Sequence, residues 1–249
     1  MSAGAIFVWE VLGTAMLILL GTGVVANHVL RKTLGHNNGF LFINFGWGFA
    51  VFTGASIAAP SGAHLNPAVT LGLAIADKVE WAKVPVYFAG ELVGAILGAV
   101  LCWAAYKLQF DDHPEPENTL GIFSTGPQIP NVAWNLVTEI IGTFVLVGWI
   151  LLSPTFSAGS SGVPTFGNSA LGYAGVSFVV LVICTSLGGP TGYAINPARD
   201  LGPRIAYAFL LPIKGKGDPN WGYSWIPVVG PLVGGSIASL VYLAVHNLT

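Results

Sequence analysis

Two copies of one tripeptide are the residues in this chain best placed to do chemistry. They are Asn66-Pro67-Ala68, within "SGAHLNPAVTLG", and Asn196-Pro197-Ala198, within "GYAINPARDLGP". Proline suits the first turn of a helix, where its missing N–H would have no partner, and asparagine suits the N-cap before it. Each tripeptide therefore predicts a helix start, with a positive dipole end and an asparagine amide free to donate a hydrogen bond.

The composition indicates a lipid environment. Of 249 residues, 53% are hydrophobic and 8% charged, with a net charge of −2, whereas soluble domains carry about 25% charged residues. No basic run suggests a nucleic acid partner. Apolar runs long enough to cross a bilayer, which takes about 20 residues, lie near 5–27, 40–59, 84–106, 133–153, 170–187 and 224–245.

Residues 61–76 and 190–211 do not fit this pattern, because they are apolar but too short to cross and begin with glycine- and proline-rich backbone. Such backbone is tolerated at membrane depth only where it is buried in protein or lines a cavity. We therefore predict two half-helices whose N-termini meet near the bilayer centre. Residues 107–131, with acids and several prolines, are expected to form a surface loop.

The chain also repeats itself. The motif Glu-x-x-Gly-Thr occurs at Glu10 and again at Glu139, and each copy precedes an Asn-Pro-Ala segment by nearly the same distance. "AGELVGAILG" in the third run likewise matches "VGPLVGGSIA" in the sixth. Three crossings per copy make the repeats inverted. This predicts one transmembrane domain, 1–249, with repeats at approximately 1–108 and 132–249 and a connecting loop at 109–131.

Two asparagine donors backed by two positive helix ends would suit a narrow lumen. A neutral hydroxyl or water can accept hydrogen bonds there, while a cation loses its hydration and meets positive potential. The pattern thus favours passage of small neutral solutes with exclusion of ions and protons. The plainer alternative is that each tripeptide only caps a helix.

"SGAHLNPAV" and "GYAINPARD" resemble the two signature loops of the aquaporin family, and the resemblance covers essentially the whole chain. It implies an all-α right-handed bundle of six transmembrane helices and two half-helices, a homotetramer in the cell membrane, and cytoplasmic termini. "NPARD", with Asp200, resembles the aquaglyceroporin branch, which includes bacterial glycerol facilitators. The solutes then expected are glycerol and water, with dihydroxyacetone, urea and undissociated lactic acid as further candidates. No cofactor or metal is expected.

The family's constriction maps onto Trp47, Cys184, Tyr193 and Arg199. Arg199 would donate to solute hydroxyls and repel cations, while Trp47 and Tyr193 would form an aromatic corner for the carbon side of a polyol. The Cys184 thiol is expected to face the lumen. Typical glycerol facilitators have glycine and phenylalanine where Cys184 and Tyr193 stand. The alternatives are a packing role for Trp47 and a loop role for Tyr193.

Three carboxyl groups and one histidine lie inside the apolar region. Glu10 and Glu139 are expected to accept hydrogen bonds from backbone N–H groups of the broken segments. Glu91 stands where the family usually has glutamine, and is expected to be protonated or hydrogen-bonded to the same backbone. His64 either lines the cytoplasmic half of the lumen or braces the loop.

A proton-coupled secondary transporter, with Glu91 or His64 carrying the proton, is the alternative function, since inverted repeats and broken helices occur in both classes. No spacing of serine, cysteine, histidine and acids assembles a nucleophile with its base, so an enzyme is not expected. The loop charges conflict with cytoplasmic termini under the positive-inside rule. With cytoplasmic termini, the external loops would hold Arg31, Lys32, Lys107, Arg204, Lys214 and Lys216, whereas the cytoplasmic loops would hold only Lys78 and Lys83.

Overall fold

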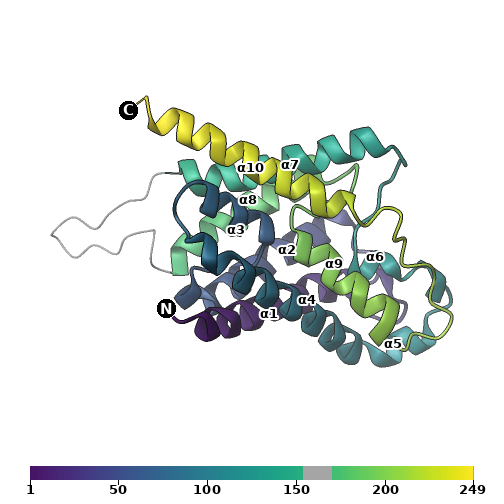
Figure 1. The fold of residues 1–249 in the computed structure, drawn as a ribbon. Coiled ribbons are helices and arrows are strands. Elements are labelled where there is room, and N and C mark those ends of the chain that lie inside the picture. The colour runs from purple at the N-terminus through teal and green to yellow at the C-terminus, as the bar shows by residue number, and fades with distance from the viewer. Residues whose placement is uncertain (154–169, 249) are drawn as a thin grey trace.

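The computed structural model describes residues 1–153 and 170–248, and all the regular secondary structure within them is helical (Figure 1). The six expected long helices are present: α1 (Ala3–Val29), α2 (Phe40–Ile57), α4 (Val84–Ala105), α7 (Val132–Leu152), α8 (Ala170–Leu187) and α10 (Ile226–His246). Five of them are long and apolar enough to cross a membrane. The sixth, α8, is apolar and adjoins the undescribed residues 154–169. The predicted all-α membrane fold is confirmed.

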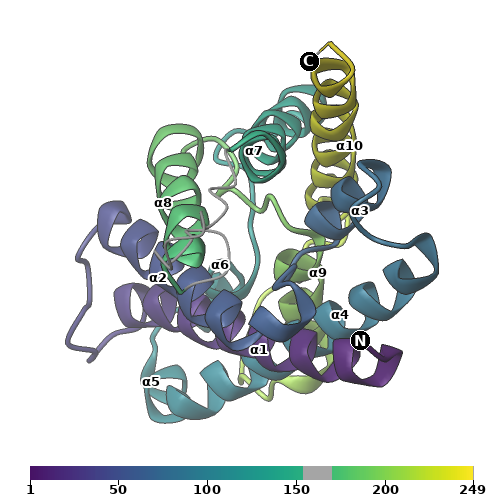
Figure 2. The same ribbon diagram turned by 90° about the vertical axis from the view of Figure 1, so that its left-hand side faces the viewer.

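The long helices pack in corresponding pairs in the two halves of the chain. Helix α1 packs against α4 and α2, and α7 packs in the same way against α10 and α8 (Figure 2). Glycines allow the closest of these approaches, because a Cβ on Gly94 would lie 2.9 Å from Cβ of Thr14, and one on Gly230 would lie 2.7 Å from Cβ of Glu139. This correspondence agrees with the predicted repeat, whose boundaries stay a prediction.

Two short helices enter between the long ones. They are α3 (Pro67–Ile75) and α9 (Pro197–Ile205), each starting at the proline of an Asn-Pro-Ala tripeptide, as predicted. Helix α9 continues as a π-helical turn, η4 (Ala206–Leu210), and a 3₁₀ turn, η1 (Ala59–Ser61), precedes α3. Each half-helix packs against a long helix of the other half, α3 on α10 and α9 on α4. The two halves therefore interlock at the half-helices.

The connection between the halves is more ordered than the expected surface loop. It contains α5 (Lys107–Asp112), η3 (Pro116–Asn118) and α6 (Leu120–Phe123). A further 3₁₀ turn, η2 (Trp81–Lys83), lies outside this connection, directly before α4. Phe110 and Phe123 are buried and stacked, with ring centroids 5.7 Å apart, and Phe123 also contacts Tyr207 after α9. These aromatic contacts hold the segment against the bundle. Its polar composition gave no indication of this packing.

Candidate functional site

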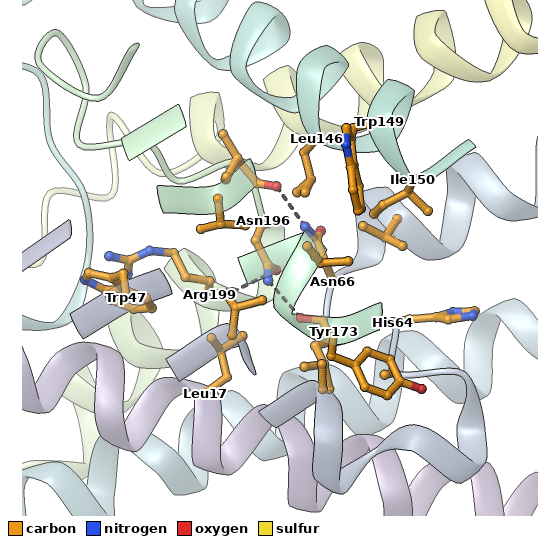
Figure 3. Close-up of a pocket in the computed structure, with 18 of the residues that line it drawn as sticks. Leu17, Trp47, His64, Asn66, Leu146, Trp149, Ile150, Tyr173, Asn196 and Arg199 are labelled. Atoms are coloured by element: carbon orange, nitrogen blue, oxygen red, sulfur yellow. Dashed lines mark hydrogen bonds between the residues drawn. The ribbon is translucent and has the colours of Figure 1, made fainter. Parts of the chain in front are cut away.

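A cavity of about 420 Å³ lies between the two halves, and residues of both line it. Asn66 and Asn196 lie at its centre, with Arg199 and Trp47 to one side of them and His64 to the other (Figure 3). Residues singled out in the sequence therefore lie on both sides of the two asparagines along one cavity.

The two asparagines cap their own helices and also bond to the opposite loop. Asn66 Oδ1 accepts from the N–H of Ala68 at 2.9 Å, while its Nδ2 donates to the Ile195 carbonyl at 2.9 Å. Asn196 Nδ2 donates to the Leu65 carbonyl at 2.8 Å. An amide nitrogen has two N–H groups, so one remains on each for the cavity. The expected capping by each oxygen is present, but the expectation that each NH₂ is free to donate is corrected, because one of its two N–H groups bonds to the opposite loop.

The residues before each half-helix have left-handed backbone. Leu65 (φ 55°) and Ile195 (φ 43°) both carry side chains that disfavour this region, as do Ala63 (φ 56°) and Tyr193 (φ 44°). Such residues cost of order 1–3 kcal/mol each and persist only where surrounding contacts hold them. The two loops are therefore strained and need anchors.

Glu139 and Glu10 are those anchors. Glu139 accepts from the Thr191 hydroxyl at 2.7 Å and from the N–H groups of Ala194 and Ile195 at 3.0 and 2.8 Å. Glu10 in the same way accepts from Ser61 Oγ at 2.6 Å and from the N–H groups of His64 and Leu65 at 3.2 and 2.8 Å. The expected hydrogen bonds to loop backbone are confirmed. The backbone N–H groups can only donate, so both oxygens of each carboxyl act as hydrogen-bond acceptors for its loop.

Arg199 and Trp47 are brought together. The guanidinium carbon lies 3.9 Å from the centroid of the Trp47 ring, a cation–π geometry, and Nη1 donates to the Phe123 carbonyl at 3.1 Å. Gly21 faces the indole, and a Cβ there would overlap the ring. Arg199 is 7% exposed and that surface lines the cavity. A permanent positive charge thus borders the space.

Tyr193 lines the cavity, as expected, but Cys184 does not. Within the described part of the chain, Cys184 is 0% exposed and absent from the cavity wall. Its thiol lies against the Tyr193 hydroxyl, which also donates to Asn44 Oδ1 at 2.9 Å. The expectation that this thiol faces the lumen is wrong in this structure, because the tyrosine that packs beside it occupies the wall instead.

On the other side of the asparagines, His64 both lines the cavity and braces its loop. Its ring stacks on Tyr87 with centroids 3.9 Å apart, and Nδ1 lies 2.8 Å from Thr70 Oγ1. Thr70 in turn donates to Glu91 Oε1 at 2.7 Å, whereas Glu91 Oε2 has no hydrogen-bond partner among the described residues. Glu91 therefore bonds to a hydroxyl of α3, and its carboxyl also lies against the backbone N–H of Asn66, as the expected contact with loop backbone requires.

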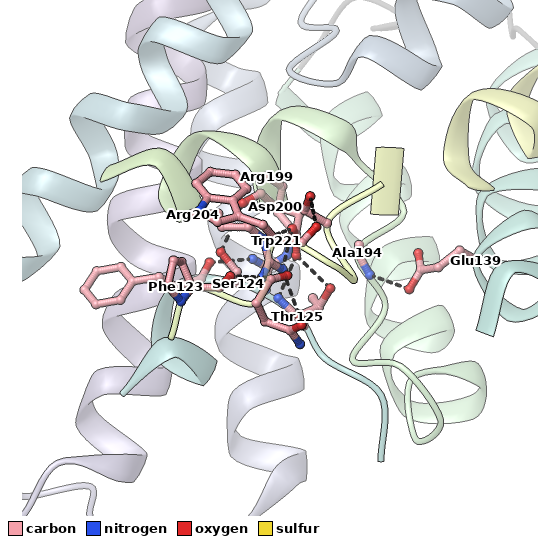
Figure 4. A network of polar contacts seen from close by, with 12 residues as sticks. Phe123, Ser124, Thr125, Glu139, Ala194, Arg199, Asp200, Arg204 and Trp221 are labelled. Atoms are coloured by element: carbon pink, nitrogen blue, oxygen red, sulfur yellow. Dashed lines mark hydrogen bonds and ion pairs between the residues drawn. The ribbon is translucent and has the colours of Figure 1, made fainter. Parts of the chain in front are cut away.

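Asp200 belongs to a buried network beside the cavity (Figure 4). It forms an ion pair with Arg204, with 2.7 Å between Oδ1 and Nη2, and accepts a hydrogen bond from Thr125.

Sequence reasoning missed Phe123 and Thr125, since neither belongs to a motif. It also missed the lining residues Trp149, Tyr173 and Ser153. Among the described residues, no group of three or more histidines, cysteines and acids could hold a metal.

Comparisons with known proteins place the chain among relatives of one family. The family model "Major intrinsic protein" matches residues 2–242. The glycerol uptake facilitator protein of Bacillus subtilis is 48% identical over 236 residues, covering 94% of this chain and 82% of that protein. The probable glycerol uptake facilitator protein of Thermotoga maritima is 46% identical over 239 residues, covering 96% and 98%.

Among solved structures, the X-ray structure of the aquaglyceroporin from Plasmodium falciparum matches with a TM-score of 0.80 and 30% identity over 100% of both chains. The family model and these relatives each span nearly the whole sequence, half-helices included. The chain belongs to the major intrinsic protein family.

Proposed function

We propose that this chain is a passive channel for small neutral solutes, with glycerol the principal one and water a second. The observation that carries the proposal is the meeting of two asparagine-capped half-helix N-termini in one cavity, with Arg199 beside them. Each helix end adds roughly half a positive charge. Together with the guanidinium they favour hydroxyl acceptors and oppose cations.

The cavity wall suits a solute with hydroxyls on one edge and carbons on the other. The Trp47 and Tyr193 rings provide an apolar surface, while Arg199 and the remaining N–H of each asparagine provide donors. A polyol can present its carbon side to the rings and its oxygens to the donors. The bacterial relatives are named as glycerol uptake facilitators, which supports glycerol as the solute.

Passive flux requires no proton carrier and no bond making or breaking. His64 Nδ1 and Glu91 Oε1 are both engaged with Thr70. The relatives' names describe facilitation, not coupled transport or an enzyme. The proton-coupled alternative is therefore set aside.

The proposal includes a homotetramer in the cell membrane with cytoplasmic termini. The loop charges oppose this orientation, although several of them have local partners in the folded chain. Arg204 is fully buried against Asp200, Lys32 donates to Asp112 at 2.7 Å, and Lys107 pairs with Asp111. A single cysteine introduced between 111 and 119 should label from outside intact cells, and failure to label would reverse the orientation. Native mass spectrometry of the detergent-solubilised channel should give four chains.

The test of function is stopped-flow light scattering on proteoliposomes, with empty liposomes as the control. Glycerol and water flux should rise with protein content, should not saturate, and should not respond when the proton gradient is collapsed. Dihydroxyacetone, urea and undissociated lactic acid measured alongside would define the range of solutes. Saturating flux driven by a proton gradient would refute the proposal.

A further inference from the structure

A closed circuit of hydrogen bonds connects the guanidinium of Arg199 to the residue that follows it. The circuit leaves α9 through Arg199, enters the connecting segment at Phe123, and returns to α9 at Asp200 through Thr125 (Figure 4). Within the described residues, the Phe123 carbonyl is the one hydrogen-bond acceptor for the Arg199 side chain. That carbonyl and the Trp47 ring together therefore fix where the guanidinium rests.

Asp200 fixes the segment that carries the carbonyl. Its Oδ2 accepts from both the N–H and the hydroxyl of Thr125, at 2.7 and 2.8 Å, and its own carbonyl accepts from Ser124 Oγ at 3.0 Å. Three hydrogen bonds thus hold the two residues that follow Phe123. Phe123 itself is fully buried between aromatic rings, so the segment has little freedom once Thr125 is tied.

Arg204 closes the circuit from one helical turn further along α9. Its Nε and Nη2 donate to Asp200 Oδ1 at 2.9 and 2.7 Å, and Nη2 also donates to the Thr125 carbonyl at 2.9 Å. Its Nη1 donates to the Pro219 carbonyl at 2.6 Å. The carboxylate and guanidinium are both 0% exposed, and their partners satisfy them in place of water.

We propose that Thr125, Asp200 and Arg204 are positioning residues that hold Arg199 back against the cavity wall and thereby set the ratio of glycerol to water permeability. None of the three lines the cavity; Thr125 and Arg204 act through the Phe123 carbonyl, and Asp200 acts both through it and by its negative charge beside Arg199. If the segment loosens, the guanidinium loses its acceptor and must be solvated by water in the cavity. It then moves into the lumen, which obstructs glycerol more than water. This inference rests on the proposed function.

The sharpest test compares two replacements of Thr125. Thr125→Val keeps the shape but removes the hydroxyl bond to Asp200 Oδ2, whereas Thr125→Ser keeps that bond. Thr119→Val is the matched control, because it removes a buried hydroxyl of the same connecting segment whose partners are the Pro116 carbonyl and the Tyr207 hydroxyl and not Asp200. The readout is the glycerol-to-water permeability ratio in proteoliposomes, which does not depend on how many channels fold.

Because hydrogen bonds to charged groups are the stronger ones, we expect Thr125→Val to lower the ratio about threefold or more. Thr125→Ser and Thr119→Val should keep the wild-type ratio, and Asp200→Asn should lower it at least as far as Thr125→Val. An unchanged or raised ratio in Thr125→Val overturns the inference, as does an equal fall in Thr125→Ser or Thr119→Val. A wild-type channel that conducts no glycerol would instead refute the proposed function.

Discussion

Replacing Glu139 by glutamine should loosen the second re-entrant loop while leaving the shape of the side chain unchanged. Oε1 accepts two hydrogen bonds, from Thr191 and Ala194, and Oε2 accepts one, from Ile195. A glutamine can keep its oxygen toward the first two, but its NH₂ then faces the N–H of Ile195. The glutamine NH₂ and the Ile195 N–H are both donors, so the hydrogen bond that Oε2 had accepted is lost. Ile195 already has a left-handed backbone conformation.

The magnitude follows from these three bonds. A buried donor that loses its partner costs about 1–3 kcal/mol, and the two bonds that remain lose the contribution of a charged acceptor, so the total is about 2–4 kcal/mol. Glu10→Gln should cost less, because its contact with the N–H of His64 is the longest of the six, at 3.2 Å.

The two replacements should also be coupled. Asn66 donates to the loop that Glu139 holds, and Asn196 donates to the loop that Glu10 holds. Loosening one loop already weakens the asparagine hydrogen bonds that join the two loops. The double variant should therefore lose less free energy of unfolding than the sum of the two single variants. Groups that share a network typically show coupling of about 0.5–3 kcal/mol.

Unfolding in mixed micelles by titration with sodium dodecyl sulfate, followed by fluorescence of the eight tryptophans, gives the free-energy differences. Glu80→Gln is the matched control, because Glu80 is exposed and contacts Lys83 at the surface. If Glu139→Gln unfolds within about 0.5 kcal/mol of wild type, the usual range for surface changes, Glu139 does not anchor the loop. Strict additivity would refute the coupling.

Three further outcomes are expected. Arg199→Ala should raise the permeability of polyols larger than glycerol and admit a cation current, since it removes the positive group beside the cavity; solute ranking and conductance equal to wild type would show that Arg199 is not at the constriction. A small mercurial should react slowly and leave glycerol flux unchanged, because Cys102 and Cys184 are both 0% exposed. A rapid block of glycerol flux that the Cys184→Ser replacement abolishes would show instead that the Cys184 thiol faces the lumen. Gly13→Ala should reduce the yield of folded channel far more than Gly142→Ala, because the new Cβ would lie 2.7 Å from the Gly54 carbonyl oxygen, whereas at Gly142 it meets a side-chain methyl of Ile195 at 3.0 Å; equal yields would contradict this.

The parts of the fold that could be predicted are those in which local chemistry is decisive. Proline and asparagine fix the start of each half-helix, at Pro67 and Pro197, whatever surrounds them. Continuous apolar runs of about 20 residues have the length of a transmembrane helix, in which every backbone hydrogen bond is made within the segment. The paired positions of Glu10 and Glu139 were informative because a carboxylate inside an apolar segment must find donors.

The parts that could not be predicted depend on how helices rotate and which segments meet. The apolar sequence around Cys184 gives no preferred face, so its burial behind Tyr193 becomes visible only in the packed bundle. The role of the Phe123 carbonyl is equally hidden, because any residue type supplies a carbonyl. The prolines and acids of 107–131 suggested a surface loop, and no motif there pointed to contact with α9.

Each asparagine donates to a carbonyl of the opposite loop, and this has a consequence for when the centre of the protein can form during synthesis. Asn66 and the Leu65 carbonyl are synthesised long before their partners, which follow 129 and 131 residues later. After insertion of the first half, its re-entrant loop has one donor and one acceptor waiting at membrane depth. Water must satisfy them until the second loop arrives, because unpaired polar groups in lipid are costly. The two bonds that join the loops at the centre can therefore form only after the second half has been made.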